Sequence, residues 1–403
     1  MSIVQKSLSK SFNDFFDSEK SSGILLIICT VISLLLANSI IGPRYLGMWD
    51  FQVVGMSVEH WINDGLMAIF FLLIGLELER EFYNGELSNF KNALLPIFAA
   101  TGGVCLPALI HFILNSGTPT QGGMGIPMAT DIAFALGVLA LLGRRVPASL
   151  KVFLTALAVM DDLAAIVVIA IFYTAHLSVA YLIGAVAVFG LLIALNRVFR
   201  VMSLLPYLIG GALMWFLMMK SGVHATIAGV LLAFTIPFSA KADDEASPSH
   251  RLEHFLHKPV TFLILPLFSL ANTGVILGPS WAQHLTTPNS LGITAGLIVG
   301  KPLGIFLSSL LTIGVGICRL PLDLNLRHIF GAGLLGGIGF TMSIFITNLA
   351  FGGNPEMISA SKIAILLSSL TAGTIGFLWL KLWGRPVPSD LDTDTMDFQL
   401  LED

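Results

Sequence analysis

Residues 152–173 read VFLTALAVMDDLAAIVVIAIFY, an apolar run that carries two adjacent carboxylates, Asp161 and Asp162, near its middle. A helix rises about 1.5 Å per residue, so about 20 apolar residues cross the ~30 Å hydrocarbon core of a bilayer. A charge at the bilayer centre costs at least ~2.5–3.5 kcal/mol, so a charge kept there is a candidate for function. The run therefore predicts a membrane helix with a functional carboxylate pair.

The composition of the whole chain agrees with a membrane protein. Hydrophobic residues make up 55% of the 403 positions and charged residues only 11%, against roughly 25% charged residues in soluble domains. We therefore expect an all-α polytopic membrane protein. The balance of 21 Lys+Arg against 25 Asp+Glu offers no basic face for nucleic acid. Cys29, Cys105 and Cys318 lack metal-ligand spacing, and we expect no cofactor.

Twelve apolar segments are predicted to cross the membrane. They are residues 23–42, 58–80, 92–115, 122–143, 149–174, 178–198, 201–219, 221–239, 257–278, 290–317, 328–351 and 356–382. With this count, all but four of the 21 lysines and arginines fall on the same side as the amino terminus. Arg44 and Lys220 lie on the other side, and Lys301 and Lys362 lie within spans. The positive-inside rule therefore predicts that both termini are cytoplasmic.

The flanks of this membrane domain are polar. Residues 1–22 form a cytoplasmic segment, either a short amphipathic helix on the membrane surface or a frayed terminus. The first apolar run, which begins at Gly23, has no A-x-A exit, so we expect it to be retained as a span. Residues 23–384 form one transmembrane domain, and the acidic tail 385–403 is expected to be disordered. The outer loop 43–57 is expected to contain a small hairpin.

Few charges lie inside the spans, and their placement suggests a mechanism. The deep ones are Asp131, Asp161, Asp162 and Lys301, while Asp64, Glu77 and Lys362 lie nearer span ends. Adjacent helix residues point about 100° apart, so one carboxylate can face a cation while the other faces a base. Lys301 is the only well-buried base within the spans. Such a group can hold protons or a hard cation, which compete for the same oxygen atoms.

Two glycine-rich stretches are expected to interrupt their helices. GGMGIPMATDIAFALG (122–137) contains Pro127 before Thr130 and Asp131, and GAGLLGGIGFTMSIF (331–345) contains five glycines. Interrupted helices in the two halves of a chain are typical of transporter sites. The alternative is close packing of small residues between membrane helices.

Six motifs resemble the NhaA sodium/proton antiporter family along essentially the whole chain. They are MATDIAFALGVLALLG, ALAVMDDLAAIVVIAIFY, GLELEREF, RLEHFLH, VGKPLGI and GIGFTMSIFI. The resemblance implies inverted-topology repeats, spans 3–5 and 10–12, in which spans 4 and 11 are interrupted and cross. It also implies that Asp161 and Asp162 bind sodium and protons, that Thr130 lines the site, and that Asp131 and Lys301 compensate the half-helix ends. Lys301 is further implied to pair with Asp161.

Members of that family respond to pH at a cytoplasmic cluster. The matching positions are Glu77, Arg80 and Glu81 at the inner end of the second span, Glu253, His254 and His257 before the ninth, and His224. Without the resemblance, these residues could be ordinary solvated or interfacial charges. Histidines can titrate near neutrality, which gives the sensor interpretation a physical basis.

The function expected from the sequence is exchange of cytoplasmic sodium, or lithium, for external protons across a bacterial inner membrane, regulated by pH and serving sodium and pH homeostasis. The partners expected are these ions, membrane lipid and, by resemblance, a second copy of the chain. Two rivals remain. An intramembrane aspartyl protease would need facing aspartates from separate helices, and a transporter of organic anions would use Lys301, although three aspartates disfavour an anion.

Overall fold

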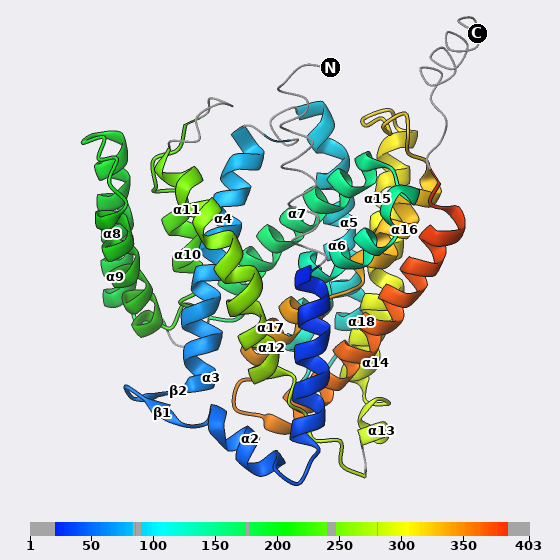
Figure 1. The fold of residues 1–403 in the computed structure, drawn as a ribbon, viewed down its shortest axis with the longest axis horizontal. Helices are drawn as coiled ribbons and strands as arrows, with labels where there is room; N and C mark the ends of the chain where they lie inside the picture. Colours follow the sequence, from blue (N-terminus) through cyan, green and yellow to red (C-terminus); the bar gives the residue numbers. More distant parts are fainter. Residues whose placement is uncertain are drawn as a thin grey trace, which may run out of the picture.

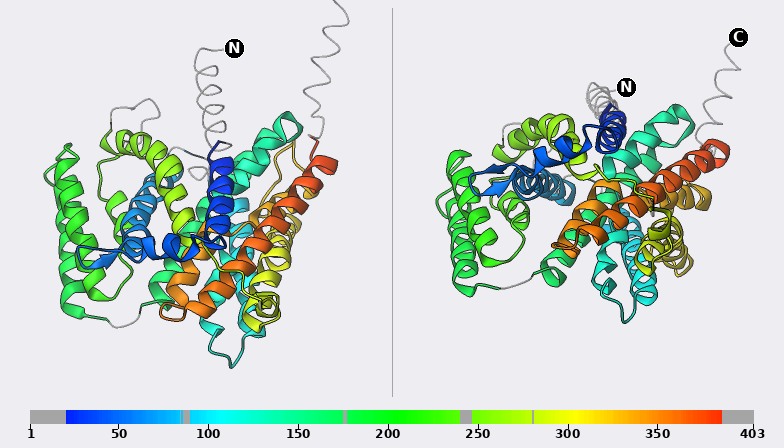
Figure 2. Two further views of the ribbon diagram at one scale, coloured as in Figure 1. Left: turned by 60° about the horizontal axis from the view of Figure 1, so that its bottom comes forward. Right: turned by 90° about the horizontal axis from the view of Figure 1, so that it is seen from below.

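The computed structural model describes residues 21–83, 85, 90–174, 177–239, 247–279 and 281–385, and this part of the chain is mostly helical (Figures 1 and 2). Eight helices within it are long and apolar enough to cross a membrane. Two further helix pairs, bent by 119° and 46°, would raise the number to ten if each pair is one span. The prediction of a polytopic helical membrane protein therefore agrees with the model, while the count of twelve stays a prediction.

One end of the molecule carries the only strands in the described part of the chain. The helix Ser21–Ala37 is followed by α2 (Gly42–Trp49), β1 (Gln52–Val53) and β2 (Met56–Ser57). The strands pair antiparallel, which confirms the expected hairpin, and Val54 and Gly55 turn the chain at positive φ. The helix α2 replaces part of an expected loop, because Pro43 occupies its first turn, where proline favours helix initiation. We call this the hairpin end (Figure 1).

The remaining elements of the first half are helical. They are α3 (Val58–His60), the π-helical turn η1 (Trp61–Leu66), α4 (Met67–Tyr83), α5 (Phe90–Leu114), the 3-10 segment η3 (Gln121–Met128), α6 (Ile132–Leu141), the short turn η4 (Gly143–Arg145), α7 (Ala148–Phe172), α8 (Val179–Arg197), α9 (Leu205–Ser221) and α10 (Ile227–Ala233). The expected seventh and eighth spans coincide with α9 and α10, which have only 17 and 7 residues.

The second half continues in the same way. Its elements are α11 (Pro248–Pro259), η5 (Val260–Ile264), α12 (Leu265–Asn272), α13 (Trp281–His284), α14 (Pro288–Ala295), η6 (Gly296–Gly300), α15 (Lys301–Gly314), α16 (Leu326–Gly336), α17 (Phe340–Ala350) and α18 (Pro355–Trp383). Both η5 and η6 are π-helical turns that join their neighbours into one long helix.

The helices form two groups by their contacts. The core bundle consists of α5, η3, α6, α7 and α14–α18, which pack closely on one another. The side bundle consists of η1, α4, α8–α11, η5 and α12, together with the helix Ser21–Ala37, which is hydrogen-bonded to α12 through Thr30 and Ser269. The two groups meet mainly where α4 contacts α7 and where α12 contacts α17. In Figures 1 and 2, α8 and α9 lie at one edge and α15, α16 and α18 toward the other.

Two helices of the core bundle are interrupted where the glycine-rich stretches predicted. After η3 the chain is extended over residues 129–131, and α6 begins behind Asp131. The helix α16 ends at Gly336, and α17 continues at Phe340 with a bend of 46°. At Gly337 a Cβ atom would lie 2.4 Å from the Leu297 carbonyl oxygen, so the second break needs glycine for close backbone approach.

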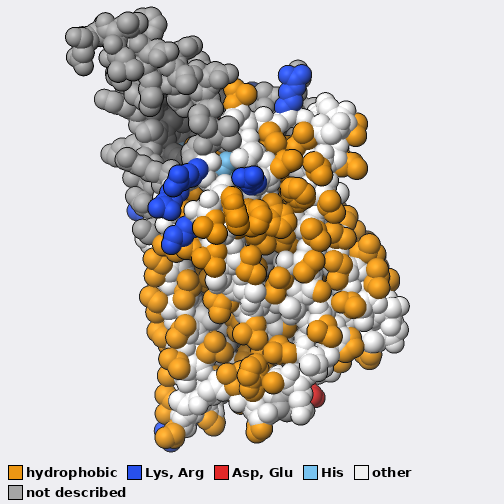
Figure 3. Space-filling model, turned by 90° about the vertical axis from the view of Figure 1, so that its right-hand side faces the viewer, with side chains coloured by type: hydrophobic (Ala, Val, Ile, Leu, Met, Phe, Trp, Pro, Cys, Tyr) orange, Lys and Arg blue, Asp and Glu red, His pale blue; other side chains and the backbone are white. Residues whose placement is uncertain are grey.

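The outer surface fits a lipid environment. In Figure 3 hydrophobic side chains cover most of the visible face, and Lys and Arg side chains gather mostly at its upper end. Exposed apolar residues of this size and number would be unfavourable in water. The fully buried interior, in contrast, includes charged side chains such as Asp161 and Lys301.

Candidate functional site

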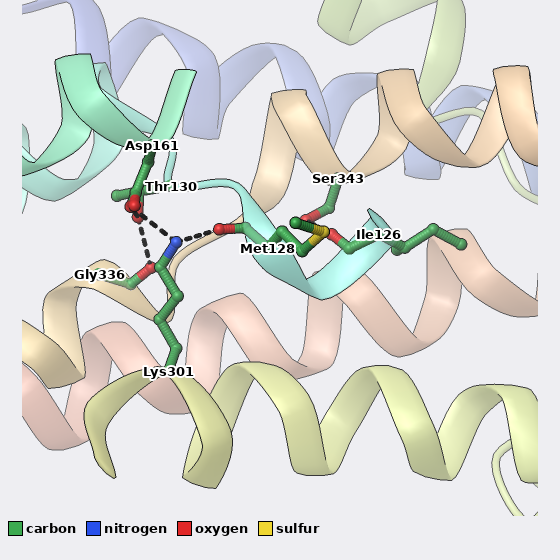
Figure 4. A network of polar contacts seen from close by, with 7 residues as sticks. All are labelled: Ile126, Met128, Thr130, Asp161, Lys301, Gly336 and Ser343. Carbon is green, nitrogen blue, oxygen red and sulfur yellow. Dashed lines mark hydrogen bonds and ion pairs between the residues drawn. The ribbon is translucent and has the colours of Figure 1, made fainter. Parts of the chain in front are cut away.

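The two interrupted helices touch each other at their breaks. The Asp131 amide donates to the Ile338 carbonyl at 2.7 Å, and the Ser343 hydroxyl donates to the Ile126 carbonyl at 2.6 Å. Backbone groups released by an interrupted membrane helix must find partners inside the protein. Each break therefore satisfies part of the other, and the side chains of Lys301 and Thr130 donate further hydrogen bonds to the Met128 and Gly336 carbonyls (Figure 4).

Lys301 and Asp161 meet beside these breaks. Lys301 lies at the start of α15 and Asp161 in the middle of α7, and both side chains are fully buried. The Lys301 ammonium lies 2.7 Å from Asp161 Oδ2 and also donates to the Met128 carbonyl at the end of η3 (Figure 4). One lysine thus compensates a carboxylate and the carboxyl-terminal end of a half-helix, where negative partial charge accumulates.

Thr130 connects the carboxylate to the second break. Its hydroxyl lies 2.6 Å from Asp161 Oδ2 and 2.9 Å from the Gly336 carbonyl, the last residue of α16 (Figure 4). A hydroxyl carries one proton, so it can donate to only one of these oxygens at a time. When it donates to Gly336, its oxygen lone pairs remain free to contact a cation. Thr130 therefore brings an oxygen atom and a switchable donor to the same point.

Asp162 differs from its neighbour. Its side chain is 1% exposed, yet neither carboxylate oxygen has a hydrogen-bond partner within the described residues, and Asp161 Oδ1 has none either. A buried ionised carboxylate without a partner is strongly unfavourable. Three carboxylate oxygens at adjacent positions are therefore available to a proton or a hard cation.

Asp131 occupies a different place from the vicinal pair. Its Oδ1 accepts from the Phe134 amide at the start of α6, and its Oδ2 accepts from the amide and hydroxyl of Thr341 at the start of α17. These distances are 3.0, 2.9 and 2.6 Å. Helix amino termini carry positive partial charge and unpaired amides. Asp131 thus caps two half-helices at once.

No group of three or more His, Cys, Asp or Glu side chains is placed to hold a metal ion in the part of the chain that the structure describes. A cation bound at the vicinal pair would therefore take further oxygen ligands from Thr130, backbone carbonyls or water.

The candidate pH-sensing residues divide into two places. Arg80 on α4 forms an ion pair with Glu253 on α11, and its guanidinium lies 3.7 Å from Glu81. Glu77 and His257 line a cavity at this end of the molecule, and His254 is exposed. His224 lies apart from this cluster: its imidazole Nε2 is 2.7 Å from the Tyr173 carbonyl, and Asp64 is the acidic group that acts on it. The structure therefore separates His224 from the other candidates.

The cavity lies between the two bundles. Its walls include Phe70 of α4, Ile132 of α6 and Leu265 of α12, besides Glu77 and His257. Glu77 also acts electrostatically on Asp162. Glu77 thus belongs both to the wall of the cavity and to the charges that surround Asp162.

Some contributing residues were not identified from the sequence. Thr341 and Ser343 stand within the motif GIGFTMSIFI but were not singled out, although hydroxyl residues after a glycine-rich break are suited to satisfying free backbone groups. Glu79, which is 7% exposed and bonded to Ser249, was also missed among the charges of GLELEREF. Lys362, in contrast, was identified from the sequence; it lies on α18 and interacts electrostatically with the carboxylate of Glu59.

These features define a polytopic helical membrane protein with a buried polar site at two interrupted helices, the architecture of secondary transporters. The model of the Na+/H+ antiporter 1 family matches residues 13–380, and the chain belongs to this family. A Na(+)/H(+) antiporter NhaA of Dechloromonas aromatica is 72% identical over 383 residues, which is 95% of this chain and 98% of the relative. An antiporter of the same name from Cytophaga hutchinsonii is 58% identical, over 93% of this chain and 96% of the relative.

The family settles two of the open alternatives. The chain is a transporter and not an enzyme, so the protease interpretation falls. Asp131 also has both carboxylate oxygens engaged in helix capping rather than facing Asp161 as a proteolytic partner. Sodium/proton exchange replaces organic-anion transport as the activity, and sodium ions and protons are the substrates.

Proposed function

We propose that Asp161 and Asp162 form the site at which sodium, or lithium, and protons bind alternately during exchange. Asp162 is assigned as the principal ligand, Asp161 as the second carboxylate, and Thr130 as an oxygen ligand and hydrogen-bond donor. Lys301 balances Asp161, and Asp131 holds the two half-helix ends in place. The sodium ion in this proposal is a substrate and not a resident cofactor.

One observation carries the proposal: the buried Asp162 carboxylate has no hydrogen-bond partner among the described residues, beside a second carboxylate that is paired with lysine. Either a proton or a cation removes the cost of this charge, but the same oxygen atoms cannot serve both well. Competition for one site, followed by exposure of that site to the opposite side, couples the two ion movements in opposite directions.

Lys301 gives the site its electrical balance. With both carboxylates ionised and the lysine charged, the group carries one net negative charge, which a sodium ion neutralises. When a proton replaces sodium on Asp162, the net charge is again neutral. Both loaded forms of this three-residue group therefore avoid a net charge in the membrane interior, whereas the empty form does not, and the charge of Asp131 is balanced separately by the amino-terminal ends of α6 and α17. This difference favours movement of the loaded site and disfavours ion leak.

The orientation follows from the basic residues. We place the end that holds Arg80, Glu253 and His257 in the cytoplasm, because most lysines and arginines fall on that side. Cytoplasmic sodium then enters by the cavity between the bundles, and external protons drive its exit across a bacterial inner membrane. Both termini, with the segments 1–22 and 385–403, lie on the cytoplasmic side of the single domain 23–384 in this arrangement.

Several finer features belong to the same proposal. The chain crosses the membrane twelve times, and spans 3–5 and 10–12 form inverted repeats around the interrupted spans 4 and 11. Two copies associate in the lipid bilayer through the hairpin end. Glu77, Arg80, Glu81, Glu253, His254 and His257 regulate exchange by pH, supported by the Arg80–Glu253 ion pair between α4 and α11. His224 would contribute from its separate position beside Tyr173.

The test is sodium-dependent proton flux in everted membrane vesicles that contain Asp162→Asn. Asparagine keeps the volume of the side chain but cannot take up a proton or offer two charged oxygens. We expect flux to fall to the background level of vesicles without the protein, with near-normal folding. Asp323→Asn, in the loop before α16, is the matched control and should exchange normally. Normal flux through the Asp162 variant would overturn the site assignment.

A further inference from the structure

Three asparagines form a hydrogen-bonded chain near the hairpin end. Asn63 belongs to η1 and Asn272 to the last turn of α12, both in the side bundle, while Asn348 belongs to α17 in the core bundle. The Asn272 amide nitrogen donates to Asn63 Oδ1 at 2.7 Å, and the Asn348 amide nitrogen donates to Asn272 Oδ1 at 2.6 Å. The chain thus links the two bundles through one hydrogen bond, between Asn272 and Asn348.

The amide of Asn272 is fully used in this arrangement. Its nitrogen also donates to the Phe268 carbonyl at 3.0 Å, so both of its protons are held within the side bundle. Its oxygen is left pointing at the core bundle. Asn63 is therefore a positioning residue, because it fixes the orientation in which Asn272 can accept a bond from Asn348. Asn272 is 1% exposed, which makes an unsatisfied amide there costly.

An apolar layer lies on the same three helices, because η1 and α4 are parts of the continuous helix Val58–Tyr83. Phe71 of α4, Phe268 of α12 and Phe345 of α17 are all at most 1% exposed. The Phe345 ring centroid is 5.6 Å from that of Phe71 and 6.4 Å from that of Phe268. Phe345 precedes Asn348 by one helical turn, and Phe268 precedes Asn272 by one turn. An aromatic layer and a hydrogen-bonded layer therefore close the contact between the bundles at this end.

On the other side of the aromatic layer, toward the end that carries Arg80, the two bundles enclose a cavity. There the cavity lined by Phe70, Glu77, Ile132 and His257 separates α4 and η5 from α6. The two bundles are thus joined by hydrogen bonds and aromatic rings toward the hairpin end and have a cavity between them toward the end that carries Arg80 and Glu253. This asymmetry describes one of the two states that an alternating-access transporter must adopt.

We propose that Asn63, Asn272 and Asn348, with the aromatic layer beneath them, form the outer closure of the exchange path, and that the Asn272–Asn348 bond breaks each time the site opens outward. The bond is net favourable yet weak, as one hydrogen bond between two amides should be. It therefore holds the outer side closed without making outward opening rare. The assignment of this closure to the outer side rests on the orientation of the proposed function.

The test uses Asn348→Ala in the full-length purified protein, followed by amide hydrogen exchange. Loss of one hydrogen bond should shift the ratio of inward-open to outward-open protein about fivefold toward the outward-open form. Exchange should rise in η1 and α17 and fall in the α4 and α6 segments that line the cavity. In everted vesicles the apparent affinity for sodium should fall by up to about fivefold, because less protein exposes the site to that side.

A second variant and a control separate closure from general stability. Asn63→Ala should act in the same direction but less strongly, since it frees the Asn272 amide without removing its acceptor oxygen. Asn289→Ala is the matched control, because this buried asparagine bonds to His111 and Ser361, all within the core bundle. It should change exchange locally, without opposite changes at the two ends. Opposite changes in the control, or none in Asn348→Ala, would overturn the proposal.

The outcome for the orientation can be read separately. Val54, which is 88% exposed at the hairpin turn, can be replaced by cysteine in a chain whose Cys29, Cys105 and Cys318 are alanine. A membrane-impermeant maleimide should label Val54→Cys in right-side-out vesicles. Labelling only in everted vesicles would overturn the outer assignment and the proposed direction of transport. Amide exchange does not require transport, so failure of the Asp162 assignment leaves the closure test interpretable.

Discussion

The sharpest test of the electrostatics of the site is Lys301→Met, which removes the ammonium while keeping a long side chain. Lys301 is fully buried and contacts both Asp161 and the Met128 carbonyl. Breaking a buried ion pair by removing one partner costs ~3–5 kcal/mol, because the remaining charge is uncompensated. Asp161 can escape much of this cost by taking up a proton. Stability measured at neutral pH should therefore fall by less than that range.

The same reasoning gives the pH dependence of sodium binding. The free energy of binding one proton changes by ~1.4 kcal/mol for each pH unit. A cost of about 3 kcal/mol then corresponds to about two pH units. In Lys301→Met, the pH at which sodium binding reaches half its maximum should move upward by about that amount. Sodium binding should be weaker than in the native protein at neutral pH and should recover toward the native value as the pH rises.

The assay is sodium titration of purified protein at several pH values, by calorimetry or by the release of protons, together with chemical denaturation at two of them. Lys362→Met is the matched control, because Lys362 is also buried within a membrane helix but forms no ion pair with the aspartates among the described residues. The control should leave the pH dependence of sodium binding unchanged. Native stability and a native pH profile in Lys301→Met would refute the role given to the ion pair.

Three further variants test individual contacts. Thr130→Val should weaken sodium binding about tenfold in the same titration, since a hydrogen bond to a charged group contributes ~1.5–3 kcal/mol and an oxygen ligand is also lost. An unchanged affinity for sodium would show that Thr130 is not part of the site. Asp131→Asn should lower the free energy of unfolding by ~1–3 kcal/mol, because one amide oxygen must replace two charged oxygens that cap α6 and α17. A native free energy of unfolding, measured by chemical denaturation, would argue against the double cap. His254→Ala combined with His257→Ala should shift the pH at which sodium/proton exchange in vesicles begins more than it changes the maximum rate. An unchanged pH profile would show that the two histidines are ordinary solvated residues without a role in pH regulation.

Much of the site could be inferred from the sequence, because membrane burial makes each charge informative. Asp161, Asp162 and Lys301 stand within long apolar runs, so their burial in the membrane interior could be predicted. Adjacent helix residues point about 100° apart, so the two aspartates could also be expected to face different partners. The interruptions also followed from local chemistry, since glycine and proline before Thr130 weaken a helix. A hairpin was also predicted within the loop 43–57, and its strands lie at residues 52–53 and 56–57.

Other features could not be read from the sequence because they depend on contacts between distant segments. Asp131 caps α6, which follows it directly, but its bonds to Thr341 arise only when the two breaks meet. The chain from Asn63 to Asn348 likewise joins residues far apart in sequence. Asparagine in an apolar span has no fixed partner from spacing alone. The shortness of α10 also depends on packing that the hydropathy pattern does not report.

The arrangement explains why the two carboxylates are adjacent rather than on separate helices. Asp161 is held by Lys301 and Thr130, so its position is tied to both helix breaks. Asp162 is the next residue on the same helix, so its position is fixed through Asp161, although its own carboxylate oxygens have no hydrogen-bond partner among the described residues. Separate helices would require Asp162 to have its own hydrogen bonds to stay in place, and those bonds would compete with the ion. In the proposed site, adjacency therefore gives a carboxylate whose position is fixed by the helix and whose oxygen atoms remain available for a proton or a sodium ion.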